Sequence, residues 1–332
     1  MKAVRVHELI GPQGLRVDDV ADPIPGPGEV LIDVHAAGVN FPDVLLSHGK
    51  YQFRPSPPFI PGGEAAGVVA ALGPGDGNDG TGLAPRVAVG DRVAATMFYG
   101  AFAQRIVVPT QALIPLPDRV SFEVGAATLI TYLTTMHALV DRAAIRPGET
   151  LLVLGAAGGV GVAAIQLGKL LGARVIAAAS SDEKLAFCRS QGADETICYS
   201  REDLKERAKV LTGGRGIDVV YDAVGGPYSE AALRALAWEG RHLVIGFAAG
   251  DIPKIPLNLT LLKGCQIVGV FWGQFAQREP ARNRAHGDRI FAWIADGKLA
   301  PHIDAVLPID QAGQALARMA ARDVRGKLVL RP

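Results

Sequence analysis

Cysteine is scarce in this chain, and its scarcity restricts both the fold and the compartment. The 332 residues include only three cysteines, Cys188, Cys198 and Cys265. An odd and scattered set argues against a disulfide framework and fits a reducing environment, so we expect a cytoplasmic protein. The opening residues Met1–Val6 alternate as a strand does, which is unlike a signal peptide.

Long apolar runs and an excess of either charge are also missing. Glycine, proline or a charged residue interrupts each apolar stretch before it reaches the roughly 20 residues that span a membrane. Lysine and arginine number 34 against 33 aspartates and glutamates, for a formal net charge of +1. Neither a membrane nor nucleic acid is therefore expected as a partner. A chain of 332 residues that is 49% apolar exceeds one ordinary core, which predicts two domains.

The segment 151–161 is the most informative part of the sequence. An apolar run of strand length, Leu151–Leu154, leads into the glycine-rich turn Ala156-Ala-Gly-Gly-Val-Gly, and a helical pattern follows. This order places the unpaired N–H groups of a helix start at the end of a strand, where a pyrophosphate binds. Ala156 takes the first glycine position of the dinucleotide-binding fingerprint. A tight structural turn is the alternative. The expected ligand contacts are Ala157, Gly158, Gly159, Val160 and Gly161.

The pattern of predicted elements changes at Ser121. Before it, short alternating runs at 4–6, 30–34, 67–71, 91–95 and 103–108 predict a partly closed antiparallel β domain, with an exposed loop over 73–85. After a helical pattern over 121–144, strands alternate with helices, which favours buried parallel strands with right-handed crossovers. These strands are expected at 150–154, 174–179, 195–198, 219–223, 242–245 and 266–272. The expected domains are 1–121, 122–273 and 274–332, the last completing the first.

Six short motifs resemble one protein family in order and spacing. They are Gly38-Val-Asn-Phe-Pro-Asp, His48-Gly-Lys-Tyr, Pro61-Gly-Gly-Glu, Gly90-Asp-Arg-Val, the glycine turn and Gly326-Lys-Leu-Val-Leu. Along nearly its whole length the chain resembles the medium-chain dehydrogenase/reductase superfamily, and within it the zinc-free, zeta-crystallin-like quinone oxidoreductases. The resemblance implies an α/β fold, in which a Rossmann-type doubly wound parallel sheet accompanies a GroES-like, mostly antiparallel β catalytic domain.

The expected coenzyme is NADPH rather than NADH. In NAD-binding folds an acid about 20 residues past the glycines binds the ribose, and here Ala179 takes its place. Ser180, Ser181 and Lys184 follow and offer donors to a 2′-phosphate. The resemblance implies that Lys184 and Tyr199 hold this phosphate, although Lys184 also fits a solvated helix face. The neighbouring acids argue against NADPH, because they could face the phosphate: Asp182 and Glu183.

Further coenzyme contacts are expected from the resemblance and from strand ends. Thr134 would reach the nicotinamide carboxamide. Gly225 and Gly246-Phe247 end predicted strands, where such sheets bind ligands, although glycines at these places also form simple turns. The remaining expected contacts are Asn40, Phe271 and Lys327.

The residues needed for a zinc alcohol dehydrogenase are missing. A catalytic zinc needs three Cys, His or carboxylate ligands, and the corresponding positions hold Asn40, Gly63 and Thr131. The structural cysteine lobe of that family is absent too. We therefore expect a metal-free protein.

Without a Lewis acid, a conjugated acceptor is the easier substrate for hydride addition. Quinones, enones, acrylate-like acids and enoyl thioesters fit this requirement. Tyr51 is the expected proton donor, because a phenol is protonated at neutral pH; its alternative role is a loop aromatic. Asn40 would hydrogen-bond the substrate carbonyl or the nicotinamide ribose. Three aromatics suit either an apolar cleft or core packing: Phe53, Phe271 and Trp272.

Other features leave alternatives open. Arg278, Arg282, Arg284 and Arg289 form either a solvated helix face or an attraction for a phosphate-bearing substrate such as a CoA thioester. An NADPH-binding structural or regulatory protein with little turnover is the alternative function. The weakly charged strand at 266–272 should form the sheet edge, and an apolar edge favours a homodimer.

Overall fold

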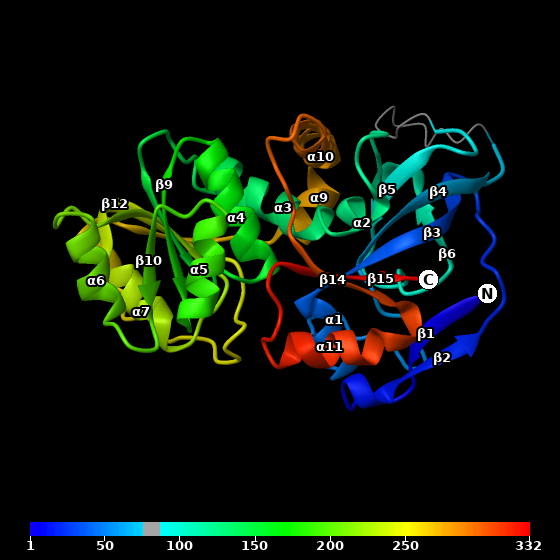
Figure 1. Cartoon of the computed structure of the whole chain (residues 1–332), viewed down its shortest axis with the longest axis horizontal. Helices are drawn as coiled ribbons and strands as arrows, with labels where there is room; N and C mark the ends of the chain where they lie inside the picture. Colours follow the sequence, from blue (N-terminus) through cyan, green and yellow to red (C-terminus); the bar gives the residue numbers. More distant parts are fainter. Residues whose placement is uncertain (76–86) are drawn as a thin grey trace. The chain divides into compact units, whose positions relative to one another are not determined.

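The computed structural model of the chain describes residues 1–75 and 87–332, and they form two compact units (Figure 1). Unit 1 contains Met1–Ile130 and Arg278–Pro332, and unit 2 contains Thr131–Gln277. The sequence placed the boundaries after 121 and 273, whereas the division by contacts falls after Ile130 and Gln277. Most of the loop expected over 73–85 lies outside the described residues.

Unit 1 is built on a seven-stranded sheet, counted within the described residues. The order is β14-β15-β3-β4-β5-β7, and β6 also pairs with β3. The long central strand β3 alternates buried and half-buried residues over its first part, with Val30, Ile32 and Val34 pointing into the core. The strands are β3 (Glu29–Val39), β4 (Glu64–Leu72), β5 (Arg92–Thr96), β6 (Arg105–Pro109), β7 (Leu113–Pro115), β14 (Ile303–Pro308) and β15 (Lys327–Arg331).

The pairs of this sheet are antiparallel except β14 with β15, which run parallel. A separate antiparallel ribbon joins β1 (Lys2–Val6) to β2 (Leu15–Asp19). The helices of unit 1 are α1 (Phe41–Ser47), α2 (Phe122–Ala126), α10 (Pro280–Ala295) and α11 (Ala312–Ala320), and α9 (Trp272–Arg278) ends at its boundary. The mostly antiparallel β domain is confirmed.

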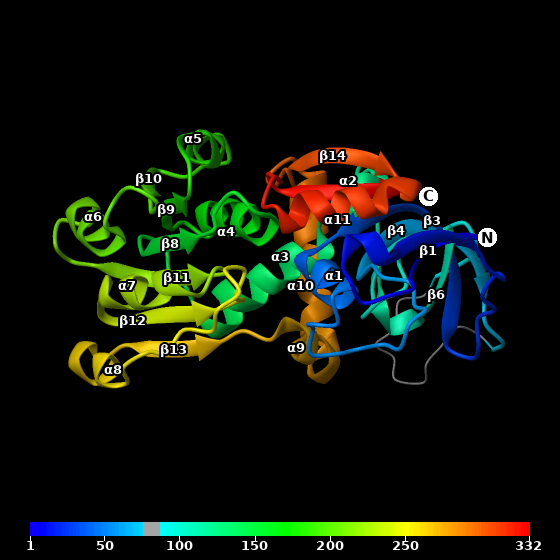
Figure 2. The same ribbon diagram turned by 90° about the horizontal axis from the view of Figure 1, so that it is seen from below.

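Unit 2 is a six-stranded parallel sheet in the order β10-β9-β8-β11-β12-β13. Figure 2 shows β8, β11, β12 and β13 running side by side in that order. The strands are β8 (Thr150–Leu154), β9 (Arg174–Ala179), β10 (Glu195–Cys198), β11 (Ile217–Asp222), β12 (Leu236–Val244) and β13 (Gln266–Gly269). Every residue of β8 is buried, as expected for a parallel strand covered on both faces.

The helices of unit 2 connect these strands. They are α4 (Gly159–Leu170), α5 (Asp182–Ser190), α6 (Leu204–Leu211), α7 (Pro227–Arg234) and α8 (Asn258–Lys263). The expected helix over 121–144 is instead three pieces: α2, α3 (Leu129–Met136) and a π-helical segment, His137–Arg142. The predicted Rossmann-type arrangement is confirmed, since the order reverses beside β8 with β9 and β10 on one side and β11 to β13 on the other.

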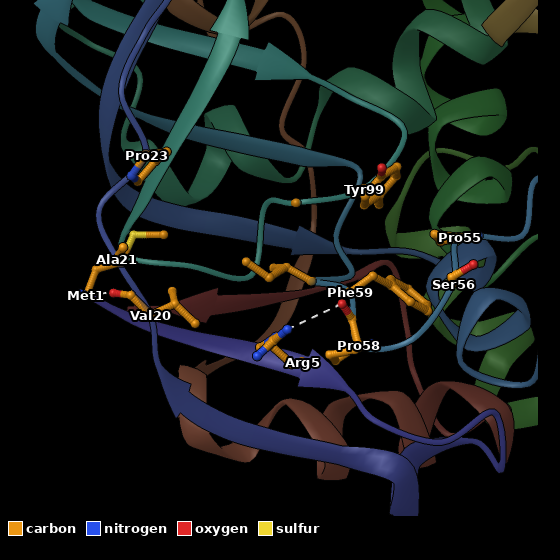
Figure 3. A pocket seen from close by; sticks show the side chains of 12 residues that line it. Met1, Arg5, Val20, Ala21, Pro23, Pro55, Ser56, Pro58, Phe59 and Tyr99 are labelled. Atoms are coloured by element: carbon orange, nitrogen blue, oxygen red, sulfur yellow. Dashed lines mark hydrogen bonds between the residues drawn. The ribbon is translucent and has the colours of Figure 1, made fainter.

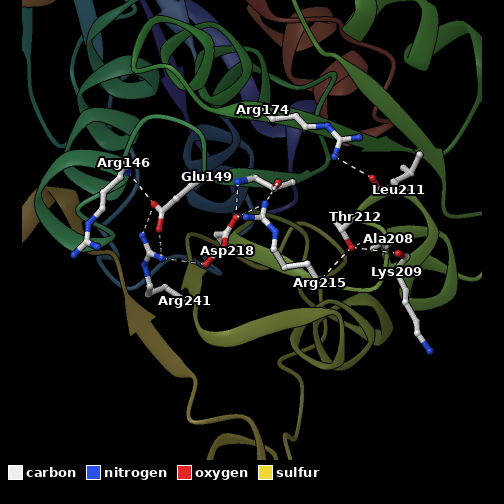
Figure 4. A network of polar contacts seen from close by, with 12 residues as sticks. Arg146, Glu149, Arg174, Ala208, Lys209, Leu211, Thr212, Arg215, Asp218 and Arg241 are labelled. Carbon is white, nitrogen blue, oxygen red and sulfur yellow. Dashed lines mark hydrogen bonds and ion pairs between the residues drawn. The ribbon is translucent and has the colours of Figure 1, made fainter.

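A network of charged residues ties together the amino ends of the parallel strands (Figure 4). Arg241 donates to both carboxylate oxygens of Glu149 at 2.8 Å and to the carbonyl oxygen of Ala143 at 3.0 Å. Asp218 accepts from the backbone N–H of Thr150 at 2.7 Å. Burial acts to raise the pKa of Glu149, but hydrogen bonds from Arg241 and from the backbone of Arg146 outweigh it and lower that pKa. The network therefore favours the ionised carboxylate.

This network predicts an acid-dependent contribution to stability. The pKa of Glu149 is lowered from 4.5 by folding, so its contribution is present above that pH and is lost as the pH falls through the folded-state pKa. We expect Arg241→Met to lower the free energy of unfolding by about 2 kcal/mol near neutral pH and to flatten its decline in acid. Urea unfolding followed by circular dichroism across this range measures both effects.

Arg234→Met is the matched control, because Arg234 pairs with Glu230 on the exposed surface of α7. A change of less than about 0.5 kcal/mol is expected there. If the free energy of unfolding of Arg241→Met falls in acid as steeply as that of the wild type, the acid-dependent stability does not come from the pair of Arg241 with Glu149.

Candidate functional site

The glycine-rich turn lies at the carboxyl end of β8, where the strand order reverses. Gly155 has a φ of +68°, and the N–H of Gly158 donates to its carbonyl oxygen at 3.1 Å before α4 begins at Gly159. The N–H groups in the first turn of α4 have no acceptor within the helix. They supply partial positive charge at this strand end, which suits the pyrophosphate of a dinucleotide.

The two outer glycines of this turn have different physical roles. A Cβ on Gly161 would lie 2.5 Å from the carbonyl oxygen of Gly155 and 2.6 Å from that of Ala156, so the packing of helix on strand requires glycine. A Cβ on Gly158 would meet nothing closer than the oxygen of Gly155 at 3.5 Å. Gly158 therefore leaves open space in which a ligand can approach the backbone, and the residues present fit a dinucleotide.

The expected phosphate-binding residues meet at the ends of β9 and β10. The N–H of Tyr199 donates to the carbonyl oxygen of Ala179 at 3.2 Å, and the Ser200 hydroxyl donates to the carbonyl oxygen of Ser180 at 2.8 Å. Ser181 caps α5 by accepting from the N–H of Lys184 at 3.3 Å. Ser180, Lys184 and Tyr199 thus come from segments that adjoin.

One of the two acids that argued against a phosphate here is itself paired. Asp182 accepts a hydrogen bond from the guanidinium of Arg201 at 2.5 Å. The sequence analysis missed Arg201, although its position two residues after Tyr199 is a signal that could have found it. The ring of Tyr199 lies against that of Tyr228, with centroids 4.3 Å apart.

Asp222, which the sequence analysis also missed, organises the end of β11. Its buried carboxylate accepts from the N–H groups of Val224 and Gly225 at 2.9 Å each, from the hydroxyl of Ser229 at 2.5 Å and from His242 at 3.1 Å. Burial acts to raise the pKa of Asp222, but these hydrogen bonds prevail and lower it. The charged carboxylate thus fixes the loop that carries Gly225.

Gly225 and Phe247, both expected at the coenzyme site, are neighbours in unit 2. Gly225 has a φ of +70°, and a Cβ there would lie 2.8 Å from Cδ1 of Phe247. The N–H of Gly246 donates to the carbonyl oxygen of Asp222 at 3.3 Å, which brings the ends of β11 and β12 together. On α3, Thr134 is half-buried, whereas Thr131 and Thr135 are buried.

Unit 1 contains a buried cluster of polar side chains around Lys327. Its ammonium donates to the carboxylate of Glu64 at 2.6 Å, to Oδ1 of Asn40 at 2.6 Å and to the carbonyl oxygen of Val39 at 2.9 Å. The side chains of Lys327 and Glu64 are 4% and 0% exposed. Glu64 also accepts from the N–H of Ile130 at 2.8 Å. The cluster joins β3, β4 and β15, so three distant segments build it.

The contacts of Asn40 restrict what its side chain can do. Its Nδ2 donates to Glu64 at 2.8 Å and, more weakly, to the carbonyl oxygen of Gly38 at 3.3 Å. Because both amide hydrogens are engaged, the second lone pair of Oδ1 is what a ligand can use. This arrangement suits acceptance from a hydroxyl, such as that of a ribose, better than donation to a carbonyl oxygen.

Tyr51 and Asp43 are coupled electrostatically near the start of α1. Burial raises the pKa of Asp43 to about 7, although the carboxylate accepts from the N–H groups of Asn40 at 2.8 Å and Gly62 at 3.1 Å. Burial, and then the charge of Asp43, raises the pKa of Tyr51. Tyr51 is half-buried and packs against a small cluster that includes Leu46 and Phe59. Its phenol is therefore held in the protonated form that a proton donor needs.

The aromatics suggested for an apolar cleft are not core residues. Phe53 is exposed and stacks on Tyr99, with centroids 5.5 Å apart, and Phe98 lies 6.0 Å away. Phe271 is also exposed, and Trp272 is half-buried at the start of α9. The arginines at 278–289 lie on α9 and α10. On α10 the guanidinium carbon of Arg289 lies 4.4 Å from the centroid of the Trp293 ring.

A cavity of about 560 Å³ lies elsewhere in unit 1 (Figure 3). Arg5, Val20, Pro23, Phe59 and Tyr99 are among the residues that line it. None of Asn40, Tyr51, Glu64 and Lys327 does, so this cavity is separate from the polar cluster.

The positions at which a zinc alcohol dehydrogenase would carry its catalytic zinc ligands hold Asn40, Gly63 and Thr131. In residues 1–75 and 87–332, no group of three or more His, Cys, Asp or Glu side chains is placed to hold a metal ion. Within the same ranges, none of the helices is both long and apolar enough to cross a membrane.

Comparison with known proteins identifies similar sequences and structures along the whole chain. The zinc-binding dehydrogenase family matches residues 159–285, and the alcohol dehydrogenase GroES-like domain matches residues 26–118. The quinone oxidoreductase of Pseudomonas aeruginosa is 36% identical, covering 100% of this chain and 99% of that protein. Quinone oxidoreductase-like protein 2 of Rattus norvegicus is 37% identical, covering 96% and 89%. The Escherichia coli quinone oxidoreductase complexed with NADPH superposes with a TM-score of 0.91 at 29% identity, covering 100% of both chains.

Proposed function

Because the chain is an oxidoreductase of the zinc-free quinone oxidoreductase branch of the medium-chain dehydrogenase/reductase superfamily, we propose that it reduces quinones or α,β-unsaturated carbonyl compounds with NADPH. The end of β9 carries this proposal. Position 179 holds alanine in place of a carboxylate, and the segments that follow β9 and β10 carry Ser180, Lys184 and Tyr199, whose hydroxyl and ammonium groups could bind a ribose phosphate. The similarity to a quinone oxidoreductase complexed with NADPH supports it.

The coenzyme would be held mainly by backbone groups of unit 2. The N–H groups at 159–161 would bind the pyrophosphate, and Ser180, Lys184 and Tyr199 the 2′-phosphate. We propose Thr134, Gly225, Gly246, Phe247, Phe271 and Asn40 as further contacts. The expected contact of Lys327 is replaced by a positioning role, because its three ammonium hydrogens are donated to Val39, Asn40 and Glu64. When bound, the reduced nicotinamide supplies a hydride.

Side chains of this protein would donate a proton to the substrate and hydrogen-bond the coenzyme. Tyr51 would donate a proton from its phenol, whose pKa is raised by burial. Asn40 would accept from a ribose hydroxyl through Oδ1, since Lys327 and Glu64 fix the orientation of its amide. Asn40, Gly63 and Thr131 lack the donor chemistry for a catalytic zinc, which favours conjugated acceptors that need no Lewis acid.

Stopped-flow oxidation of NADPH with a small quinone and with a panel of enones, acrylates and enoyl thioesters tests the proposal. Turnover should be faster with NADPH than with NADH and should survive dialysis against a strong chelator. Tight NADPH binding without turnover on any acceptor would instead indicate the structural or regulatory role. Activity that is lost on chelation and restored by zinc would refute a metal-free reaction.

We also propose a cytoplasmic homodimer that pairs through β13. This strand is the edge of the parallel sheet and pairs with β12 on its other side. Ile267 on β13 and Leu261 and Leu262 on α8 are exposed, which leaves apolar surface beside an edge that can accept another strand. Light scattering at micromolar concentration should give twice the chain mass, and a monomer would contradict the proposal.

A further inference from the structure

The ends of β9 and β10 bring a second cation to the place proposed for the 2′-phosphate. Cys198 and Ala179 are register partners, and the hydrogen bond from Ser200 to the carbonyl oxygen of Ser180 joins the two turns that follow them. Arg201 comes directly after Ser200, and Asp182 opens α5 directly after its cap, Ser181. The contact between Arg201 and Asp182 therefore lies within the same small group of residues as Lys184 and Tyr199.

The ion pair between Arg201 and Asp182 is exposed to solvent, so another anion can take the place of the Asp182 carboxylate. Arg201 is 62% exposed and Asp182 is 71% exposed, at an N–O distance of 2.5 Å. Ion pairs in water contribute little, because solvent screens them and the side chains lose freedom. A guanidinium carries five N–H donors in a planar arrangement that matches phosphate as well as carboxylate. A phosphate carries more charge than a carboxylate and can displace it.

We propose that Arg201 is a further determinant of coenzyme choice, which exchanges the Asp182 carboxylate for the 2′-phosphate of NADPH. This inference rests on the proposed function, because it assigns a residue to the phosphate end of the same site. Asp182 holds the guanidinium in place when no phosphate is present and competes with the phosphate for it. NADH, which lacks the phosphate, gains nothing from the exchange.

Binding measurements that need no turnover test this exchange. Calorimetry would compare NADPH with NADH, and 2′,5′-ADP with 5′-AMP, on the wild type, Arg201→Gln, Asp182→Asn and a control. Arg234→Gln serves as the control, because Arg234 forms an exposed pair with Glu230 on α7. Arg201→Gln should weaken the binding of NADPH and 2′,5′-ADP by about tenfold or more and leave the binding of NADH and 5′-AMP within about twofold of the wild type. Asp182→Asn should tighten both 2′-phosphorylated ligands by about threefold or more, because the competing carboxylate is gone.

The outcomes separate this inference from the proposed function. If Arg201→Gln weakens the binding of ligands with and without the 2′-phosphate equally, or changes neither, Arg201 does not recognise the 2′-phosphate, although the wild type can still prefer NADPH. If Asp182→Asn binds 2′,5′-ADP no tighter than the wild type, the exchange is refuted. A wild type without preference for NADPH over NADH would refute both proposals.

Discussion

Replacing Lys327 with methionine should lower the free energy of unfolding by about 3–5 kcal/mol, the largest stability effect we expect from a single substitution here. The ammonium of Lys327 bonds the carboxylate of Glu64, the amide of Asn40 and a main-chain carbonyl in a region closed to water. Methionine keeps most of the volume and removes the charge. The Glu64 carboxylate would then stay buried without its cation, and an unpaired buried charge strongly destabilises the folded state. Urea unfolding followed by circular dichroism measures the loss.

A second substitution separates the charge effect from packing. Glu64→Gln together with Lys327→Met should restore more than half of the lost stability, because neither uncharged side chain leaves an isolated ion. Lys298→Met is the control, since Lys298 pairs with Asp296 on the exposed surface. A double variant as unstable as Lys327→Met alone would show that packing, and not the buried charge, sets the cost.

Tyr51→Phe should lower kcat for enone reduction by about 10²–10⁴-fold and change quinone reduction far less. After hydride transfer an enone needs a proton on carbon, whereas a hydroquinone can take its proton on oxygen from water. Steady-state kinetics with both acceptors, read as kcat and KM separately, measure the difference. Tyr99→Phe, which removes an exposed phenol and keeps the stacked ring, should leave both rates near wild type.

The pH dependence gives an independent measure of the Tyr51 assignment. Burial and the charge of Asp43 both raise the pKa of Tyr51, so the enone rate should not fall from loss of the phenol proton until above about pH 10. Asp43, with a pKa of about 7, becomes charged as the pH rises through neutrality, and its charge then strengthens retention of the proton on Tyr51. An enone rate that is equal in wild type and Tyr51→Phe would remove Tyr51 from the chemistry.

Local sequence patterns predicted most strands of the parallel sheet well. The bounds of β9 and β10 agree with those expected, because each is a short apolar run between clear turn signals. Other elements carried weaker patterns. β12 begins at Leu236, well before the expected 242, and includes the exposed Trp238 and Glu239, which has a φ of +60°. The short helix α8 has exposed leucines on its surface and lacks the amphipathic pattern of a core helix.

The candidate site was less accessible to sequence reasoning, because its parts are far apart along the chain. Lys327 and Asn40 were singled out by resemblance, but the contact that joins them spans 287 positions. No periodic pattern in the sequence predicts a contact between residues so far apart, or predicts that Glu64 bonds to both of them. Asp222 and Arg201 were missed for the same reason, since their roles depend on partners supplied by other elements: His242 on β12 and Asp182 on α5.

The division of unit 1 into two stretches of chain restricts the order in which the protein can fold during synthesis. Unit 2 is one continuous segment, complete once the ribosome has passed Gln277. In the central sheet of unit 1, β3 pairs with β15, which consists of residues 327–331. This pairing cannot form until the whole of unit 2 has been synthesised. Domains made in one stretch can fold as they emerge. Unit 2, which carries the proposed coenzyme site, should therefore fold first, and unit 1 should depend on chaperones for longer.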